Sequence, residues 1–179
     1  MGSLPTGYLV GRARGLDIRA VGSGNIGATN VFRTLGNWAG SFVLAVDLLK
    51  GLLACTLLVL LIRQLPLPGP HPAEEAETLA IIAGVFAILG HNYPCWLGFR
   101  GGKGIATSAG VLIALVPLAL LVILTVWIVL FVLTRYVSVA SMAASFTLPF
   151  AVWFTGGSQK MILVTATLAA LAILKHRTN

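Results

Sequence analysis

The sequence predicts an all-α integral membrane protein, and three observations support that fold class. First, the 179 residues are 58% hydrophobic and only 9% charged, whereas a soluble domain has about 25% charged residues. Second, long apolar runs recur along the chain, and the longest, residues 38–62, exceeds the roughly 20 residues that a helix needs to cross a bilayer. Third, the cationic residues fall mainly between alternate runs, as membrane topology requires. We therefore expect a bundle of transmembrane helices.

Seven helices are expected to form the bundle, the first of them truncated in this chain. Residues 1–10 are apolar but too short to cross the membrane, so we interpret them as the end of a span whose beginning is missing. The other six expected spans are residues 38–62, 78–89, 105–116, 118–134, 136–155 and 161–174. Pro117 is expected to form a tight turn between two of them, and the proline-rich acidic residues 63–77 an extramembrane loop. Residues 1–179 together are expected to form a single membrane-embedded domain.

The cationic residues gather on one side of this topology. Of the 12 Lys and Arg residues, Lys50 lies inside an expected span, and only Arg63 and Lys160 fall on the other side. The remaining nine follow the odd-numbered spans: Arg12, Arg14, Arg19, Arg33, Arg100, Lys103, Arg135, Lys175 and Arg177. The positive-inside rule places these nine in the cytoplasm. The formal charge of +7 is then explained by loops that face anionic lipid and an anionic substrate, so nucleic acid is not expected as a partner.

A glycine-rich polar loop, residues 22–30, is the only long run without a majority of bulky hydrophobic side chains. Its glycines can let the backbone adopt φ > 0 and approach a ligand closely, so that successive N–H groups bind an anion. These glycines are Gly22, Gly24 and Gly27. Neutral hydrogen-bonding side chains come from Ser23, Asn25, Thr29 and Asn30, and Arg33 adds a planar cationic group suited to phosphate. The loop therefore predicts a phosphate-binding site.

Two nucleotide-binding motifs of soluble proteins resemble the glycine loops, and both are excluded by their context. Residues 22–27 match the dinucleotide fingerprint, but residues 17–21 before them carry two charges and do not read as a buried apolar strand. The second glycine cluster, residues 98–104, resembles a Walker loop that is one residue too short, and Gly104 stands where a magnesium-binding Ser or Thr is needed. The two cysteines form no ligand motif either, so no metal site is expected.

The second glycine cluster surrounds a lysine. Lys103 lies among Gly101, Gly102 and Gly104, and the helix expected from residue 105 points its positive end at this loop. A phosphate there gains both charge and backbone donors. The alternative is that Lys103 anchors the cytoplasmic face while the glycines merely turn the chain, but anchoring does not need glycine on both sides of the lysine.

Other polar residues keep a structural alternative open. Asp47 and Lys50 lie one helical turn apart within an expected span, and a structural ion pair is favoured over contact with a substrate. His91, at an expected helix end, is explained at least as well by a structural hydrogen bond. His176 and Asn179, taken by themselves, are explained by a basic helix terminus whose side chains satisfy the last carbonyls.

Three motifs together resemble those of the bacterial acylphosphate:glycerol-3-phosphate acyltransferases. They are Gly22-Ser-Gly-Asn-Ile-Gly-Ala-Thr-Asn30 with Arg33, Gly90-His-Asn-Tyr-Pro94 leading to Gly98-Phe-Arg-Gly-Gly-Lys-Gly104, and His176-Arg-Thr-Asn179. The motifs occur in order and at fitting spacing, and the resemblance covers essentially the whole chain. It departs from the family pattern at the truncated first helix, at the end of the chain after Asn179, where relatives usually continue with a basic tail, and at Thr178, where an acidic residue is common.

The resemblance implies an enzyme with seven membrane helices that performs the first acylation step of phospholipid synthesis. Such an enzyme moves an acyl group from acyl phosphate to the 1-hydroxyl of glycerol 3-phosphate, forming lysophosphatidate and phosphate. Catalytic roles are implied for Ser23, Arg33, His176 and Asn179. Substrate binding is expected from Gly22, Gly24, Asn25, Gly27, Thr29, Asn30, Gly101, Gly102, Lys103, Gly104 and Ser141.

The same resemblance implies neither a cofactor nor a metal. The expected partners are glycerol 3-phosphate, acyl phosphate and membrane lipids, and the expected location is the bacterial cytoplasmic (inner) membrane with the active site facing the cytoplasm. The alternative function is a small membrane transporter of a phosphorylated solute. Transporters usually show inverted repeats and sites at the bilayer midplane, neither of which is evident in this sequence.

Overall fold

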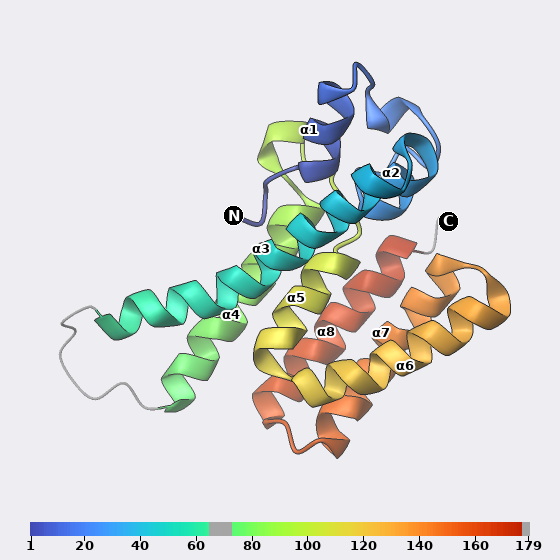
Figure 1. Ribbon diagram of the computed structural model, residues 1–179. Coiled ribbons are helices and arrows are strands. Elements are labelled where there is room, and N and C mark those ends of the chain that lie inside the picture. The colour runs from blue at the N-terminus through green and yellow to red at the C-terminus, as the bar shows by residue number, and fades with distance from the viewer. Residues whose placement is uncertain (65–72, 177–179) are drawn as a thin grey trace. The chain divides into compact units, whose positions relative to one another are not determined.

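The computed structural model describes residues 1–64 and 73–176, and the regular structure within these ranges is entirely helical (Figure 1). In chain order the helices are α1 Thr6–Ala13, η1 Ile18–Ala20, α2 Ala28–Leu35, α3 Asn37–Gln64, α4 Ala73–Asn92, η2 Cys95–Leu97, α5 Ile105–Leu115, α6 Pro117–Thr134, α7 Val137–Phe154 and α8 Gln159–His176, where η marks a 3-10 helix. The predicted all-α class is confirmed. The chain divides into two compact units, Met1–Val111 and Leu112–Asn179, and each is described by itself.

Five helical segments in the described ranges are long and apolar enough to cross a membrane. They are Asn37–Leu61, Glu75–Leu97, Pro117–Thr134, Val137–Phe154 and Gln159–His176. Two further expected spans are shorter helices: α5 has 11 residues and α1 has 8. The chain is therefore a multi-pass membrane protein.

The extramembrane loop expected at residues 63–77 was wrong at both of its ends. α3 continues to Gln64 and α4 already begins at Ala73, and residues 65–72 lie outside the described residues. A helix of 28 residues such as α3 is about 42 Å long, whereas the hydrocarbon core is about 30 Å thick. α3 is therefore long enough to extend beyond the core, so its helical structure continues past the apolar residues that were expected to form the span.

The turn expected at Pro117 lies one residue earlier, at Val116, the single residue between α5 and α6. Pro117 is the first residue of α6 and Val116 precedes it as the N-cap. The first N–H of a helix has no intrahelical acceptor, so proline is well placed at this position. The interruption between α5 and α6 follows directly from the sequence.

A small apolar core supports the glycine loop of the first unit. α1 and α2 pack against α3, and α4 runs alongside α3 (Figure 1). Ile18, Ile26, Val31 and Val43 are at most 2% exposed and form the centre of this core. Because Ile26 belongs to the loop itself, the loop is fixed to packed helices and its geometry is determined by them.

In the second unit, α7 packs against both α6 and α8. The side of α7 that is buried carries small residues, Ala140, Ser141 and Ala144, which allow close helix packing as predicted. The exposed side chains of α6 include Leu118, Leu121 and other large apolar residues. An apolar outer surface of this kind is suited to lipid.

Candidate active site

Asn30, the third residue of α2, determines the shape of the first glycine loop. Its side chain is buried, and Nδ2 donates to the carbonyls of Ile18 at 3.1 Å and Val21 at 3.0 Å. Oδ1 accepts from the Ser23 N–H at 2.9 Å. A Cβ at Gly22, where φ is +59°, would overlap this oxygen. The Asn30 side chain thus points into the loop, and both hydrogens of its amide are bonded to backbone carbonyls.

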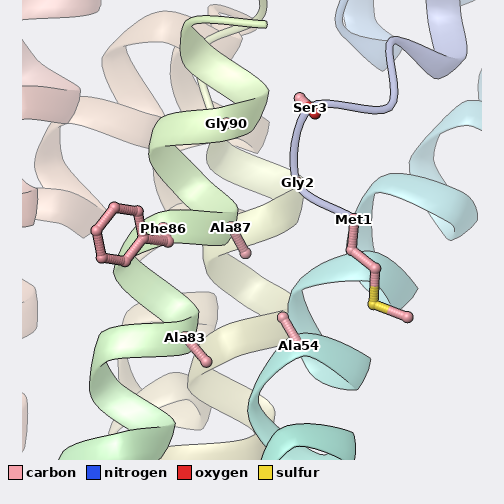
Figure 2. A pocket seen from close by; sticks show the side chains of 8 residues that line it. All are labelled: Met1, Gly2, Ser3, Ala54, Ala83, Phe86, Ala87 and Gly90. Atoms are coloured by element: carbon pink, nitrogen blue, oxygen red, sulfur yellow. The ribbon is translucent and has the colours of Figure 1, made fainter.

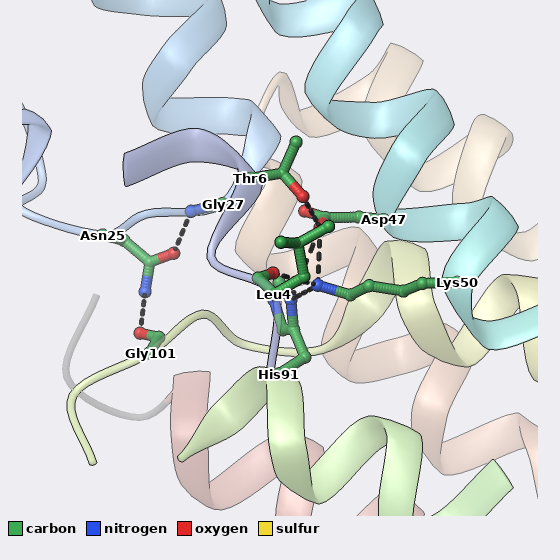
Figure 3. A network of polar contacts seen from close by, with 8 residues as sticks. All are labelled: Leu4, Thr6, Asn25, Gly27, Asp47, Lys50, His91 and Gly101. Carbon is green, nitrogen blue, oxygen red and sulfur yellow. Dashed lines mark hydrogen bonds and ion pairs between the residues drawn. The ribbon is translucent and has the colours of Figure 1, made fainter. Parts of the chain in front are cut away.

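Asn25 connects the first glycine loop to the second. Its Oδ1 accepts from the Gly27 N–H at 2.8 Å, and its Nδ2 makes a long hydrogen bond of 3.5 Å to the Gly101 carbonyl (Figure 3). The expected positive φ is found at Gly22 and Gly24 but not at Gly27, where φ is −73°. The prediction was wrong for Gly27 because this residue is the N-cap of α2 and has extended backbone.

Three polar residues of the first motif lie at the surface. Ser23, Thr29 and Arg33 are exposed. Within residues 1–64 and 73–176, no hydrogen bond or ion pair involves their side-chain polar atoms. A ligand can therefore reach the hydroxyls of Ser23 and Thr29 at the two ends of the loop. It can also reach the guanidinium of Arg33, one turn further along α2.

The glycines of the second loop are required by contact with the end of α4. The Gly101 N–H donates to the Asn92 carbonyl at 3.2 Å, and the Gly102 N–H donates to the His91 carbonyl at 3.0 Å. A Cβ at Gly101 would overlap the His91 carbonyl, and one at Gly102 would overlap the His91 imidazole. The sequence suggested that these glycines leave room for a ligand, whereas the structure uses the room to seat the loop on α4.

Lys103 differs from the other cations of the first unit. Its Nζ is buried and has no hydrogen-bond partner among the described residues. Burial lowers the pKa of Lys103 below its ordinary value. It lies two residues before Ile105, the first residue of α5, where a helix presents unpaired N–H groups and a positive dipole end. An anion bound here would supply the acceptor that Nζ lacks.

Two further buried polar atoms near the second loop lack a partner in the described part of the chain, and sequence reasoning did not single them out. They are Oδ1 of Asn92 and Oγ1 of Thr107. A Cβ at Gly104 would lie 2.7 Å from this Asn92 oxygen, so Gly104, with φ +82°, allows the loop to pass close to it. Asn92 lies in the motif of residues 90–94, but an Asn at a helix end and a Thr near a helix start are too common to have indicated a role for either side chain.

The predicted ion pair of α3 is confirmed. Lys50 Nζ lies 2.7 Å from Asp47 Oδ1, and the two side chains are 5% and 2% exposed. His91 makes the structural contact that the sequence left open, since its Nδ1 lies 2.8 Å from Lys50 Nζ. These residues face one another in the interior of the first unit (Figure 3).

The remaining predicted residues belong to the second unit. Ser141 is buried on α7, where its Oγ accepts a hydrogen bond from Trp127 Nε1 at 3.1 Å. His176 is buried at the end of α8, and its Nδ1 lies 2.8 Å from the Ala172 carbonyl. This bond to a carbonyl of the last turn is the helix-end role that the sequence offered as the alternative. Asn179 lies outside the described residues.

A groove of about 290 Å³ lies between α3, α4 and the first residues of the chain (Figure 2). Small side chains dominate its lining, among them Ala54, Ala83 and Ala87. It contains none of the predicted site residues and no charged side chain. The groove is therefore not the phosphate site.

The fold and the site define a class: a helical, multi-pass membrane protein with two glycine loops, the second of which carries a lysine whose buried Nζ has no partner among the described residues. Residues 1–179 match the protein family described as glycerol-3-phosphate acyltransferase. The glycerol-3-phosphate acyltransferase of Geotalea daltonii is 44% identical over 179 residues, which are 100% of this chain and 86% of that protein. The Bacillus subtilis enzyme of the same name is 42% identical over 180 residues, again with 100% and 86% coverage.

Solved structures agree with these sequence relatives. The crystal structure of PlsY (YgiH), an integral membrane glycerol 3-phosphate acyltransferase, in its glycerol 3-phosphate form matches with a TM-score of 0.85 and 34% identity over 99% of this chain and 84% of that chain. Its lysophosphatidic acid form matches with a TM-score of 0.83 and 33% identity over 99% and 83%. The chain belongs to the glycerol-3-phosphate acyltransferase family.

Proposed function

We propose that the protein transfers an acyl group from acyl phosphate to the 1-hydroxyl of glycerol 3-phosphate. The hydroxyl oxygen forms a bond to the acyl carbon, the bond from that carbon to the phosphate oxygen breaks, and lysophosphatidate and inorganic phosphate are the products. The observation that carries this proposal is the buried Lys103 Nζ beside the start of α5, which has no hydrogen-bond partner within residues 1–64 and 73–176. A phosphate monoester is the anion that a glycerol-3-phosphate acyltransferase must hold, and a lysine at a helix N-terminus suits it.

In this proposal, Lys103 and the first turn of α5 bind the phosphate of glycerol 3-phosphate. The Gly101 and Gly102 N–H groups are already bonded to α4, so these glycines act by placing Lys103. Five residues act in the same indirect way on the first loop, because their hydrogen bonds and close contacts are made within it, to residues 18–21 just before it, or to Gly101: Asn30, Asn25, Gly22, Gly24 and Gly27.

The exposed Ser23 and Arg33, with Thr29, are proposed to act on the reacting groups. Charge develops on the carbonyl oxygen and on the departing phosphate during acyl transfer, and cationic or hydroxyl donors stabilise that charge. The proposal assigns Ser141, His176 and Asn179 of the second unit to the same reaction, as the family resemblance implies. Acyl phosphate is already activated, so positioning and charge stabilisation are the main contributions that the protein must make.

The base in this proposal is the acceptor itself. Many glycerolipid acyltransferases use a His-x-x-x-x-Asp pair, but the residues five positions after His71 and His91 are Ala76 and Trp96. A phosphate monoester has its second pKa at about 6, close to the value that suits a general base at neutral pH. The dianion of glycerol 3-phosphate therefore accepts the proton of its own 1-hydroxyl as the new ester forms.

The membrane arrangement is part of the proposal. α1 and α5 are counted with the five long helices as membrane segments of a seven-helix bundle, and the whole chain works as one acyltransferase domain. The excess of cationic residues in the loops that carry both glycine motifs supports a site on the cytoplasmic side of the bacterial inner membrane.

The test is turnover by the purified protein in detergent, where transport has no meaning. Glycerol 3-phosphate and palmitoyl phosphate should give one inorganic phosphate and one lysophosphatidate per cycle, with Lys103→Ala as the site variant. Glycerol without its phosphate is the matched acceptor control and should remain unacylated. Turnover with palmitoyl coenzyme A in place of palmitoyl phosphate would overturn the assignment of the donor, and absence of turnover with both donors would overturn the function.

A further inference from the structure

A cluster of buried polar groups lies next to the second glycine loop in the first unit. Lys50 Nζ is 2.7 Å from Asp47 Oδ1, 2.8 Å from His91 Nδ1 and 3.0 Å from the Leu4 carbonyl (Figure 3). Thr6 Oγ1 donates to the same Asp47 oxygen at 3.2 Å. The cluster therefore joins the N-terminal residues and α1 to α3 and α4, within the apolar part of the protein.

The geometry fixes which nitrogen of His91 carries its proton. A lysine ammonium has three donors and no acceptor, and here all three hydrogens are directed to Asp47, His91 and the Leu4 carbonyl. Beside a lysine ammonium, Nδ1 of His91 takes the acceptor role and Nε2 carries the ring hydrogen. With Asp47 negative and Lys50 positive, the buried cluster has no net charge, as its surroundings require.

The far side of the same ring supports the loop that carries Lys103. A Cβ at Gly102 would overlap Nε2, so the ring and Gly102 are in direct contact. The backbone adds a second contact between the two residues, since the Gly102 N–H donates to the His91 carbonyl at 3.0 Å. Lys103 is the next residue, so the position of its backbone follows from the orientation of the His91 ring.

We propose that Asp47, Lys50 and His91 are positioning residues for the acceptor phosphate. Asp47 and Lys50 hold the His91 ring in one orientation and one tautomer, and the ring in turn holds Gly102 and Lys103 in the geometry that binds phosphate. The proposal rests on the proposed function, in which Lys103 binds glycerol 3-phosphate. It predicts a role in substrate affinity for an ion pair that lies outside the binding loops.

The first test removes the charges together. Replacing a buried ion pair by apolar residues is often neutral for stability, whereas removing one partner is strongly destabilising, so the variant is Asp47→Val with Lys50→Met. Its thermal unfolding in detergent should stay near that of the wild type. Without the Lys50 donor the ring is no longer held, so KM for glycerol 3-phosphate should rise about tenfold while kcat changes less than about twofold.

The second test keeps the ion pair and changes the ring. His91→Leu removes both nitrogens, and His91→Gln returns an amide donor near the position of Nε2. KM for glycerol 3-phosphate should rise in His91→Leu, and His91→Gln should recover part of the loss. Thr56→Val is the matched control on α3, since the Thr56 hydroxyl bonds only within its own helix, to the Leu52 carbonyl. Its KM should be unchanged.

The outcomes separate this inference from the function on which it rests. If folded Asp47→Val/Lys50→Met and His91→Leu proteins both keep the wild-type KM while Lys103→Ala raises it, the cluster is purely structural and the inference is overturned. If Lys103→Ala itself leaves KM unchanged, the phosphate-site assignment fails. Should the double variant not fold, the comparison of His91→Leu with His91→Gln decides: equal KM values in these two and the wild type overturn the inference.

Discussion

At the scale of single residues, burial distinguishes the cations of the first unit. Arg33 is exposed on α2 and Lys50 is buried but fully paired, whereas the buried Lys103 Nζ has no partner in the described part of the chain. An unpaired buried ammonium is unfavourable unless a ligand completes it. We therefore propose that Lys103 binds the acceptor phosphate and that Arg33 stabilises the charge that develops during the reaction.

The lowered pKa of Lys103 gives a prediction for pH dependence. Burial disfavours the charged form, and only the charged form binds phosphate strongly, so kcat/KM for glycerol 3-phosphate should fall as pH rises through this lowered pKa. Lys103→Arg keeps its charge at higher pH, and its profile should stay level where the wild type declines. Identical alkaline limbs in the two proteins would contradict the assignment.

Removal of Lys103 and removal of Arg33 should change different kinetic constants. Lys103→Ala removes uniform binding of phosphate and should raise KM for glycerol 3-phosphate tenfold to about a hundredfold, with a smaller change in kcat. Arg33→Ala should lower kcat by about a hundredfold if it stabilises charge in the transition state. Arg14→Ala, an exposed arginine at the end of α1, is the control and should match the wild type. If Lys103→Ala mainly lowered kcat and Arg33→Ala mainly raised KM, the roles proposed for the two residues would have to be exchanged.

The identity of the base can be tested with an altered acceptor. If the phosphate dianion accepts the proton, the acidic limb of the kcat profile follows the second pKa of the acceptor. The phosphonate analogue of glycerol 3-phosphate has a higher second pKa, so its limb should move to higher pH. An unmoved limb that disappears in His176→Gln or His91→Gln would make a histidine the base.

At the scale of elements, helix ends position both loops. The end of α4 accepts the N–H groups of Gly101 and Gly102, and the start of α2 supplies Asn30 to close the first loop. The bonds to α4 use carbonyls that a helix end leaves unpaired, whereas Asn30 bonds through its side chain. The two loops meet where the Asn25 amide reaches the Gly101 carbonyl, so each loop constrains the other.

A comparison of two glycines in the second loop tests this arrangement. Gly102→Ala would overlap the His91 ring, so the loop must move and KM for glycerol 3-phosphate should rise. Gly98→Ala has φ +59° but no atom within 4 Å of the added Cβ, so it should lower the free energy of unfolding by about 1 kcal/mol with KM unchanged. Kinetics together with thermal unfolding of both proteins distinguishes loop displacement from backbone strain. Equal KM values for the two variants would contradict the contact with α4.

At the scale of the whole molecule, the excess of cationic residues on one side of the expected topology predicts which membrane face carries the glycine loops. In a protein without other cysteines (Cys55→Ala, Cys95→Ser), single cysteines at positions 20 and 100 should be protected from an impermeant thiol reagent in intact cells, and one at position 73 should be labelled. Permeabilised cells are the control and should label all three. Labelling at position 20 or 100 from outside would place the glycine loops on the opposite face.

Local rules were sufficient for much of this protein. Apolar run length and composition determined the helical membrane class and most spans, and Pro117 determined a helix start, because each depends on residues adjacent in sequence. The pairing of Asp47 with Lys50 follows from the helical repeat alone. The motifs at residues 22–30 and 98–104 indicated the family, since their order and spacing are visible in one dimension.

Only the tertiary structure decided what the polar residues contact. Asn30 and the glycines at 101 and 102 were expected to face a ligand, and instead they hold the loops, because their partners at residues 18–23 and 91–92 were not evident from spacing. The burial of Lys103 Nζ, which has no partner among the residues that the structure describes, depends in the same way on elements distant in sequence. So does the three-way contact of Lys50 with Asp47, His91 and Leu4. Burial and hydrogen-bond partners depend on how the chain packs. They distinguish the residues that hold the loops in place from those that remain available to a ligand.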